Sequence, residues 1–86
     1  MKKTRNVVGP QVMKLRYEQK LSQPELAARC QRLGWNIGRD TIAKIEDQRR
    51  WVGDFELVGL SLALKVPVME LFPHKDRSVR LLLISK

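Results

Sequence analysis

A short stretch of the chain, Arg39 to Lys44, concentrates polar side chains of several lengths on a segment that the sequence predicts to be helical. Side chains of this kind, in the first two turns of a helix, can reach the edges of base pairs in the major groove of DNA. Arg39 can bind guanine through two hydrogen bonds, Lys44 can reach guanine or phosphate one turn later, and Asp40 can accept from the amino group of cytosine. Thr41 is a further candidate. Two simpler interpretations stay open: Asp40 only stabilises the helix N-terminus, and Arg39 meets only phosphate or solvent.

Catalysis and metal binding are disfavoured by what the sequence lacks. It has one histidine, His74, and one cysteine, Cys30, so neither a zinc cluster nor an internal disulfide is expected. No serine stands with a histidine and an acid in an interpretable arrangement, and there is no glycine-rich phosphate loop. We therefore expect no enzyme activity, cofactor or metal, with Cys30 a small core residue and His74 in solvent. No apolar stretch nears the roughly 20 residues that span a bilayer, so no membrane partner is expected and a reducing cytoplasm is the simplest location.

The charge balance points to a polyanionic partner. The 86 residues carry 17 Lys and Arg against 9 Asp and Glu, a formal net charge of +8, which suits nucleic acid or an anionic membrane face. Arg49 and Arg50 directly follow the predicted reading segment, where a loop would lie along a DNA backbone, and we expect them to contact phosphate. The basic N-terminal arm, residues 1–8 with Lys2, Lys3 and Arg5, could supply a second phosphate contact, enter the minor groove, or simply be solvated.

Helix-start signals recur along the chain and predict an all-α fold. Gly9 followed by Pro10 is typical of the N-cap and first residue of a helix. Ser22 and Glu25 form an S-x-x-E capping box. The five predicted helices are a first from Gly9, a second from Ser22 to just before Gly34, a third over 39–47 capped by Asn36 or Gly38, a fourth from Gly53 to near Lys65, and a short fifth from Pro67 to Leu71 or Phe72.

Apolar spacing assigns the inward face of each helix. The expected core positions of the first three helices are Val12, Leu15, Leu26, Cys30, Leu33, Ile42 and Ile45. The fourth helix is expected to be the central, most buried one, because it is hydrophobic nearly all round, with apolar residues at Phe55, Leu57, Val58, Leu60, Leu62 and Leu64. Trp35 should cover the loop before the third helix, and Trp51 should pack on the core edge or lie near the sugar-phosphate backbone.

Several of these motifs occur in an order typical of one known family. They are VMKLR at 12–16, LSQPELA at 21–27, TIAKIE at 41–46 and ELVGLSLALKVPVMELF at 56–72. Together they resemble the XRE/Cro-type helix-turn-helix family of phage and bacterial repressors, over residues 12–72 of the chain. The resemblance implies a five-helix, lambda-repressor-like bundle over residues 9–72, whose second and third helices read DNA. It also implies a domain that commonly binds as a symmetric dimer.

The same resemblance assigns roles to individual residues. It implies that Gln23, at the start of the second helix, contacts a phosphate. It implies that Ala27 is small so that the second and third helices can approach closely. It places Arg39, Asp40 and Lys44 where such proteins touch base edges, in agreement with the chemistry of these side chains.

The resemblance further implies a salt bridge between Arg16 and Glu46 that ties the first helix to the end of the third; the alternative is two independent surface charges. The chain also departs from the family pattern. The stretch Ala28–Gly38 is several residues longer than the usual tight turn, which indicates a lengthened second helix. Lys20 and Gln48 stand where a glycine often ends the first and third helices.

The last segment, residues 73–86, contains an apolar run from Leu81 to Ile84 that needs cover. It pairs across a dimer, docks on its own domain, or orders only against another protein.

We predict a sequence-specific double-stranded DNA-binding regulator, most simply a repressor of phage or mobile-element type that binds a palindromic operator as a homodimer. One alternative is an antitoxin-like protein that binds a toxin through this tail and autoregulates its promoter. Another is a basic module that binds RNA or membrane without specificity.

Overall fold

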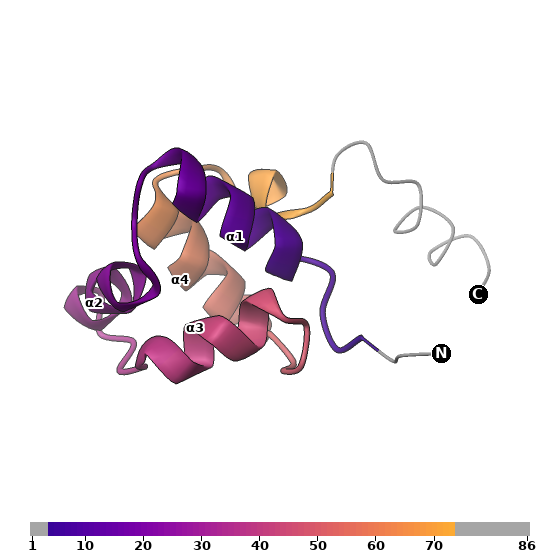
Figure 1. The fold of residues 1–86 in the computed structure, drawn as a ribbon, viewed down its shortest axis with the longest axis horizontal. Coiled ribbons are helices and arrows are strands. Elements are labelled where there is room, and N and C mark those ends of the chain that lie inside the picture. Colours follow the sequence, from indigo (N-terminus) through magenta and orange to yellow (C-terminus); the bar gives the residue numbers. More distant parts are fainter. Residues whose placement is uncertain (1–3, 74–86) are drawn as a thin grey trace.

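The computed structural model describes residues 4–73 as helices joined by short loops. The elements are α1 (Gly9–Glu18), α2 (Gln23–Arg32), α3 (Arg39–Glu46), α4 (Asp54–Leu64) and the 3-10 helix η1 (Val68–Leu71) (Figure 1). Residues 4–73 contain no strand, which confirms the all-α prediction. Among them there is also no helix with the length and apolar character needed to cross a membrane. The predictions for Lys2, Lys3, His74 and the run from Leu81 to Ile84 lie outside the described residues.

The starts of α2, α3 and α4 follow signals that the sequence carries. At α2 the hydroxyl of Ser22 accepts from the Glu25 N–H (3.1 Å), and the Glu25 carboxylate accepts from the Ser22 N–H (2.7 Å). Before α4 the Glu56 carboxylate accepts from the Gly53 N–H (3.0 Å). Gly38 is the cap of α3. These contacts satisfy backbone donors that a helix start leaves unpaired.

The start of α1 differs by one residue from the prediction. Gly9 is the first helical residue rather than the cap, and Val8 precedes it without a side-chain cap bond. The Asn6 carboxamide oxygen accepts from the Gly9 N–H at 2.8 Å. Asn6 thus does what a capping side chain does, from three residues upstream.

All four α-helices end in the same Schellman-type geometry. The residue that reverses the chain has a positive φ in each case: 59° at Lys20, 94° at Gly34, 62° at Gln48 and 59° at Lys65. The next backbone N–H donates to the carbonyl five residues earlier, at 2.9 to 3.0 Å. Three of these positions therefore hold side chains in a backbone region that favours glycine. The helices end there although the glycine common at Lys20 and Gln48 in the family is absent.

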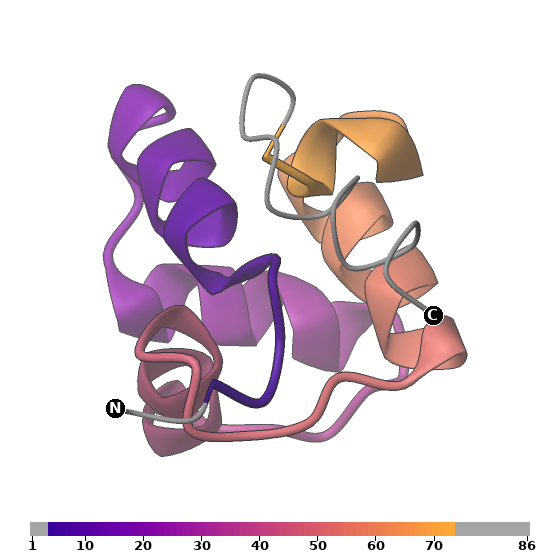
Figure 2. The ribbon, with the colours of Figure 1, turned by 90° about the vertical axis from the view of Figure 1, so that its right-hand side faces the viewer.

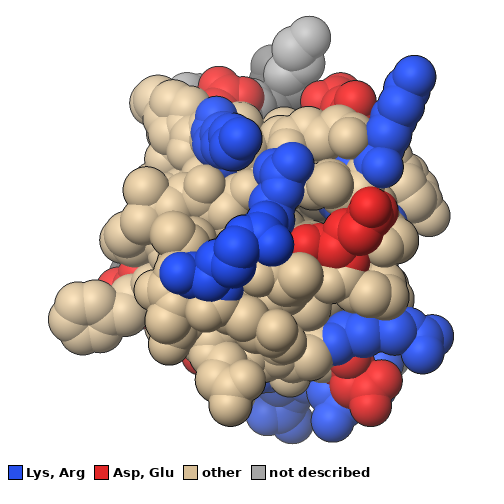
Figure 3. Space-filling view, turned by 90° about the vertical axis from the view of Figure 1, so that its left-hand side faces the viewer, with Lys and Arg blue, Asp and Glu red and all other residues tan. Residues whose placement is uncertain are grey.

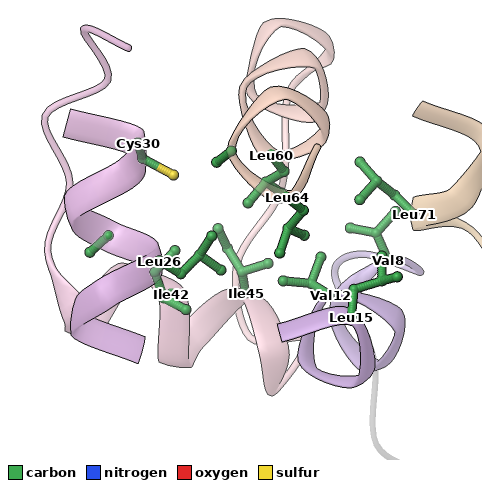
Figure 4. Packing of buried hydrophobic residues seen from close by; sticks show 12 residues of the cluster. Val8, Val12, Leu15, Leu26, Cys30, Ile42, Ile45, Leu60, Leu64 and Leu71 are labelled. Carbon is green, nitrogen blue, oxygen red and sulfur yellow. The ribbon is translucent and has the colours of Figure 1, made fainter. Parts of the chain in front are cut away.

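A single apolar core lies between the helices (Figure 4). Its buried members are Val8, Val12, Leu15, Leu26, Ala27, Cys30, Ile42, Ile45, Leu60, Ala63, Leu64 and Leu71. α3 packs against both α2 and α1, and Figure 4 shows Ile42 beside Leu26. The inward faces predicted for the first three helices are confirmed except at Leu33, which is exposed because α2 ends at Arg32 instead of continuing.

The prediction that the fourth helix is the most buried is wrong. Phe55, Val58 and Leu62 are 88, 47 and 58% exposed, and the buried face of α4 is instead formed by Leu60, Ser61, Ala63 and Leu64. Because α4 is apolar on all sides, its periodicity could not indicate which side would be covered. The indole of Trp35, from the loop before α3, packs beside Gly59 of α4, as its predicted packing role requires.

The predicted fifth α-helix is a single 3-10 turn, so residues 4–73 contain four α-helices rather than five. Figure 2 shows η1 beside the end of α4. Pro67 starts this turn and Pro73 follows it closely, which leaves too few residues for an α-helix. Leu71 alone of the turn is fully buried, and it joins the core.

Candidate nucleic-acid interface

The exposed side of α3 carries the predicted base-contacting residues. Ile42 and Ile45 are fully buried and fix one side of the helix against the core. Arg39, Asp40 and Lys44 are exposed on the solvent side, and Thr41 is partly buried. The exposed side of α3 thus presents two long cations and one carboxylate, while its other side is packed tightly against the core.

The entry to α3 is tied to α2 by one long side chain. The Gln31 side-chain amide donates to the Ile37 carbonyl at 2.6 Å. Gly38, the cap, has extended backbone dihedrals and no side chain near the helix start. The first turn of α3, where Arg39 and Asp40 lie, is therefore positioned by a contact from α2 and is left open to a ligand.

A buried ion pair holds the other end of α3. The Arg16 guanidinium donates to both oxygens of the Glu46 carboxylate, from Nε to Oε2 (2.7 Å) and from Nη2 to Oε1 (3.0 Å). A third donor, Nη1, reaches the Leu21 carbonyl (2.8 Å) at the start of α2. Hydrogen bonding to Glu46 raises the pKa of Arg16 above its ordinary value. The ion pair that the family resemblance implied is thus present, and it joins α1, α2 and α3 at one point.

Gln23 also binds this ion pair. Its side-chain amide donates to Glu46 Oε1 at 3.0 Å, and the residue is partly buried. The amide nitrogen has a second N–H, and this is the group that a phosphate would use. The phosphate role of Gln23 stays a prediction, now with an added positioning role beside Glu46.

Arg49 and Arg50, both predicted to contact phosphate, have different surroundings. Arg50 donates to both carboxylate oxygens of Glu56 (2.8 and 2.9 Å) and to the Trp51 carbonyl (2.9 Å). Arg49 pairs with Asp47 at 3.1 Å, with both side chains about half exposed. A phosphate contact from Arg49 would displace only a solvated pair, whereas one from Arg50 would compete with its bidentate bond to Glu56.

Charge interactions shift the pKa values of the Arg50–Glu56 pair in opposite directions. The hydrogen bonds to Arg50 hold the pKa of Glu56 below its ordinary value, and the bond from the Gly53 N–H adds to this effect. The hydrogen bonds to Glu56 raise the pKa of Arg50. Both groups are charged at neutral pH, so Arg50 secures the loop between α3 and α4 in the folded protein.

The base of the N-terminal arm is fixed to the end of α3 by contacts that the sequence analysis missed. The Asn6 side-chain amide donates to the Ile45 carbonyl (3.1 Å) and the Arg50 carbonyl (2.9 Å). The Gln48 side-chain amide donates to the Asn6 carbonyl (3.0 Å), and the Arg5 N–H donates to the Gln48 carbonyl (3.0 Å). The sequence did hold one signal for these contacts: Asn6 is a residue type common at helix caps, and it stands three positions before Gly9.

Trp51 does not pack on the core edge, so that prediction is wrong. It is 68% exposed, and the Arg5 guanidinium lies over its ring at 6.0 Å from the centroid. This distance is at the outer limit of a cation–π contact. Trp51 therefore lies at the surface of the loop after α3, beside Arg5 of the arm. Its alternative position near a sugar-phosphate backbone stays a prediction.

Charged side chains are scattered over the α2 side of the molecule. Figure 3 views this side and shows separate blue Lys and Arg side chains on a mostly uncharged surface, with a few red carboxylates between them. A net positive charge distributed in this way attracts a polyanion in general. Within residues 4–73, no three His, Cys, Asp or Glu side chains come together to hold a metal ion.

Two solved structures are similar to this chain. One is the restriction-modification controller protein C.AhdI from Aeromonas hydrophila, with 28% sequence identity, a TM-score of 0.67, and coverage of 76% of this chain and 87% of that one. The other is a hypothetical transcription factor, NHTF, from Neisseria, with 23% identity, a TM-score of 0.70, and coverage of 94% of this chain and 85% of that one. The second likeness concerns the fold alone.

No family model matches the sequence, and no curated protein matches it. The two structural neighbours nevertheless share the overall fold of this chain, in which α2 packs against α3. The chain is therefore similar to the XRE-type helix-turn-helix proteins, as its sequence motifs predicted.

Proposed function

We propose that this chain is a sequence-specific double-stranded DNA-binding transcriptional regulator that places α3 in the major groove. The observation that carries the proposal is the two-sided character of α3. One side is fixed by Ile42, Ile45 and the buried Glu46, and the other presents Arg39 and Lys44 to solvent. A preorganised helix with free bidentate donors is what direct base readout requires. The likeness to a restriction-modification controller supports a regulatory role.

The regulator acts as a homodimer on a palindromic operator, and as a repressor where that operator overlaps a promoter. α3 has eight residues and is therefore about 12 Å long, which covers only a few base pairs. Two copies related by a two-fold axis place their reading helices about 34 Å apart in successive major grooves. Val68 and Met69 of η1 are exposed apolar side chains, and they support this region as one contact between the two copies.

Selection of binding sites from random duplex DNA tests the proposal directly. We expect an enriched site with two-fold symmetry, and an affinity for it that exceeds the affinity for a scrambled duplex by about 10³-fold or more at physiological salt. The affinity should fall steeply with salt, because Lys and Arg displace counterions from the backbone. Equal affinity for the selected and scrambled duplexes would contradict sequence-specific regulation and favour a non-specific basic module.

The Arg39→Ala variant separates base readout from phosphate contact. We expect a loss of roughly 1–3 kcal/mol per half-site on the selected operator and a relaxed preference at one base position. Arg32→Ala, which removes an exposed arginine at the end of α2, is the matched control and should keep the base preference. A uniform loss across all DNA sequences for Arg39→Ala would show that Arg39 binds only phosphate.

A further inference from the structure

An open apolar groove lies between the exposed face of α4 and the loop after α2, outside the candidate DNA interface. Its volume is about 330 Å³, and its apolar walls include Leu33, Trp35, Phe55, Val58 and Leu62. The three α4 side chains are spaced i, i+3 and i+7, so they share one face of the helix. Large apolar side chains that are this exposed and this close together mark an interaction surface more often than isolated ones do.

The floor of the groove has a fixed shape. The Trp35 indole lies so close to Gly59 that an added Cβ would be 3.0 Å from Cε3 of the ring. The Trp35 backbone is held by its N–H to the Cys30 carbonyl (3.0 Å) and by its own carbonyl to the Ile37 N–H (2.9 Å). The aromatic floor is therefore preformed, which lowers the entropy cost of binding a ligand there.

A basic pocket adjoins the groove. This second cavity, of about 300 Å³, shares Leu33 and Leu62 with the first and is otherwise lined by Arg29, Arg32, Ala63 and Lys65. The two cavities are therefore neighbours on the surface of the protein. No carboxylate lines the basic pocket, whereas Glu56 lines the far end of the groove and is already paired with Arg50.

The cations of the pocket are only partly used by the fold. Arg29 donates to the Ala63 carbonyl (3.0 Å) and to Gln19 Oε1 (3.1 Å), which ties α2 to the end of α4. Within residues 4–73, the side chains of Arg32 and Lys65 make no hydrogen bond or ion pair. Favourable interactions with the C-terminal ends of α2 and α4 account for some of their placement. Their charges remain free for a carboxylate ligand.

We propose that this groove, lined by Leu33, Trp35, Phe55, Val58 and Leu62, docks an acidic amphipathic helix of another protein. Apolar side chains at helical spacing fill the groove, and carboxylates at one end of the segment pair with Arg32 and Lys65. Helix-in-groove recognition of this kind uses anchors at i, i+3, i+4 and i+7. The charge of the pocket fixes the direction in which the segment lies.

Two other occupants fit the charges less well. The chain's own residues 74–86 contain Lys75, Arg77, Arg80 and Lys86 against one acid, Asp76, so they carry the same sign as the pocket. A second copy brings a chain of net charge +8 to this surface.

The docking is independent of the DNA-binding proposal. The two cavities contain no residue of α3. The groove and the solvent side of α3 therefore share no residue, and a segment bound in the groove leaves Arg39, Asp40 and Lys44 exposed. A DNA-bound copy of this chain can then hold a partner at the same time, which is the arrangement that a regulator needs to recruit another protein or to be controlled by one.

The test uses three synthetic fluorescent helical peptides of equal length and the full chain. One peptide has Leu and Phe at helical spacing with three Glu at one end, the second replaces these Glu with Lys, and the third scrambles the first. Fluorescence anisotropy should show the acidic peptide binding at least tenfold more tightly than either of the others. Equal binding of the acidic and basic peptides, or no binding of any, would overturn the proposal.

Variants locate the binding on the surface. Phe55→Ser should weaken binding of the acidic peptide at least tenfold, and so should the double variant Arg32→Glu with Lys65→Glu. The double variant should also bind the basic peptide more tightly than the unmodified chain does. Met69→Ser removes an exposed apolar side chain outside the groove, and Lys14→Glu removes an exposed cation of α1. Both variants should bind the acidic peptide as the unmodified chain does. Circular dichroism checks that each variant is folded. If the control variants lose as much affinity for the acidic peptide as the groove variants do, the peptide binds elsewhere on the protein.

Two further measurements distinguish the other occupants and the DNA-binding proposal. Sedimentation that shows a dimer turning into a monomer in Phe55→Ser, with no peptide bound by the unmodified chain, would assign the groove to a second copy and overturn the inference. A tenfold gain in peptide affinity on deleting residues 74–86 would assign it to the tail instead. Operator binding by the same variants is measured separately, so loss of peptide binding alone leaves the DNA-binding proposal intact.

Discussion

Two ion pairs of similar geometry lie near the C-terminal end of the candidate reading helix, and they differ mainly in burial. Arg16–Glu46 joins α1 to the end of α3 at 2.7 Å, and its side chains are 6 and 1% exposed. Arg50–Glu56 joins the following loop to α4 at 2.8 Å, and its side chains are 31 and 27% exposed. In both pairs the arginine donates to both carboxylate oxygens.

The difference in burial changes what each pair contributes. A buried pair has lost its hydration, so either charge becomes costly when its partner is removed. A partly exposed pair can exchange its partner for water, and its loss costs little. Arg16–Glu46 therefore makes the orientation of α3 depend on α1 and α2 together, whereas Arg50–Glu56 only secures a loop and a helix start.

The largest effect should come from Glu46→Gln. The substitution leaves the Arg16 guanidinium buried without an opposite charge and turns an amide nitrogen toward its donors, so we expect a loss of about 3–5 kcal/mol in the free energy of unfolding. Chemical denaturation followed by circular dichroism measures it. The double variant Arg16→Met with Glu46→Met is the control and should lose less than Glu46→Gln alone. A loss below about 1 kcal/mol for Glu46→Gln would mean that the pair behaves like a surface one.

A smaller effect, dependent on pH, is expected from Glu56→Gln. At neutral pH the variant should lose about 0.2–1 kcal/mol in the free energy of unfolding. Because the pKa of Glu56 in the folded protein lies below its ordinary value of 4.5, its contribution is present above that value and disappears as the pH falls through the lowered folded pKa. Denaturation curves of both proteins across this acid range should converge. A difference that persists at the acid end would mean that the carboxylate charge is not the cause.

The smallest effect on stability should come from Arg49→Ala. Arg49 and Asp47 are 50 and 54% exposed, so the free energy of unfolding should change by less than about 0.5 kcal/mol. The same variant should weaken binding to all DNA sequences alike, if Arg49 contacts phosphate. Denaturation and DNA titration of one preparation compare the two effects. A stability loss as large as that of Glu56→Gln would contradict the expectation that the more exposed ion pair contributes less to the free energy of unfolding.

Local signals were the part of the fold that the sequence could predict. The Ser22–Glu25 capping box and the Gly53–Glu56 pair involve residues three positions apart, so the bonds that start α2 and α4 are encoded where they act. The solvent side of α3 was also predictable, because Ile42 and Ile45 leave only one side for Arg39. The DNA-contacting roles of these side chains remain predictions.

Contacts between distant segments could not be read in the same way. Asn6 binds carbonyls 39 and 44 residues away, and Arg29 binds the Ala63 carbonyl 34 residues away. Backbone carbonyls are present at every residue, so no residue type at the acceptor marks such a bond. For α4 the difficulty was different: a helix that is apolar on every side gives no periodic signal for the side that the core will take.

Cys30 gives the molecule an internal probe of its own opening. It is the one cysteine of the 86 residues, it is fully buried, and burial raises the pKa of its thiol to about 11. A thiol reagent at neutral pH can react only after α2 separates from the core, because the thiol must first reach solvent and ionise. The labelling rate therefore reports how often this region opens, without any added label. Ligands that bind the closed form would slow it in proportion to their occupancy.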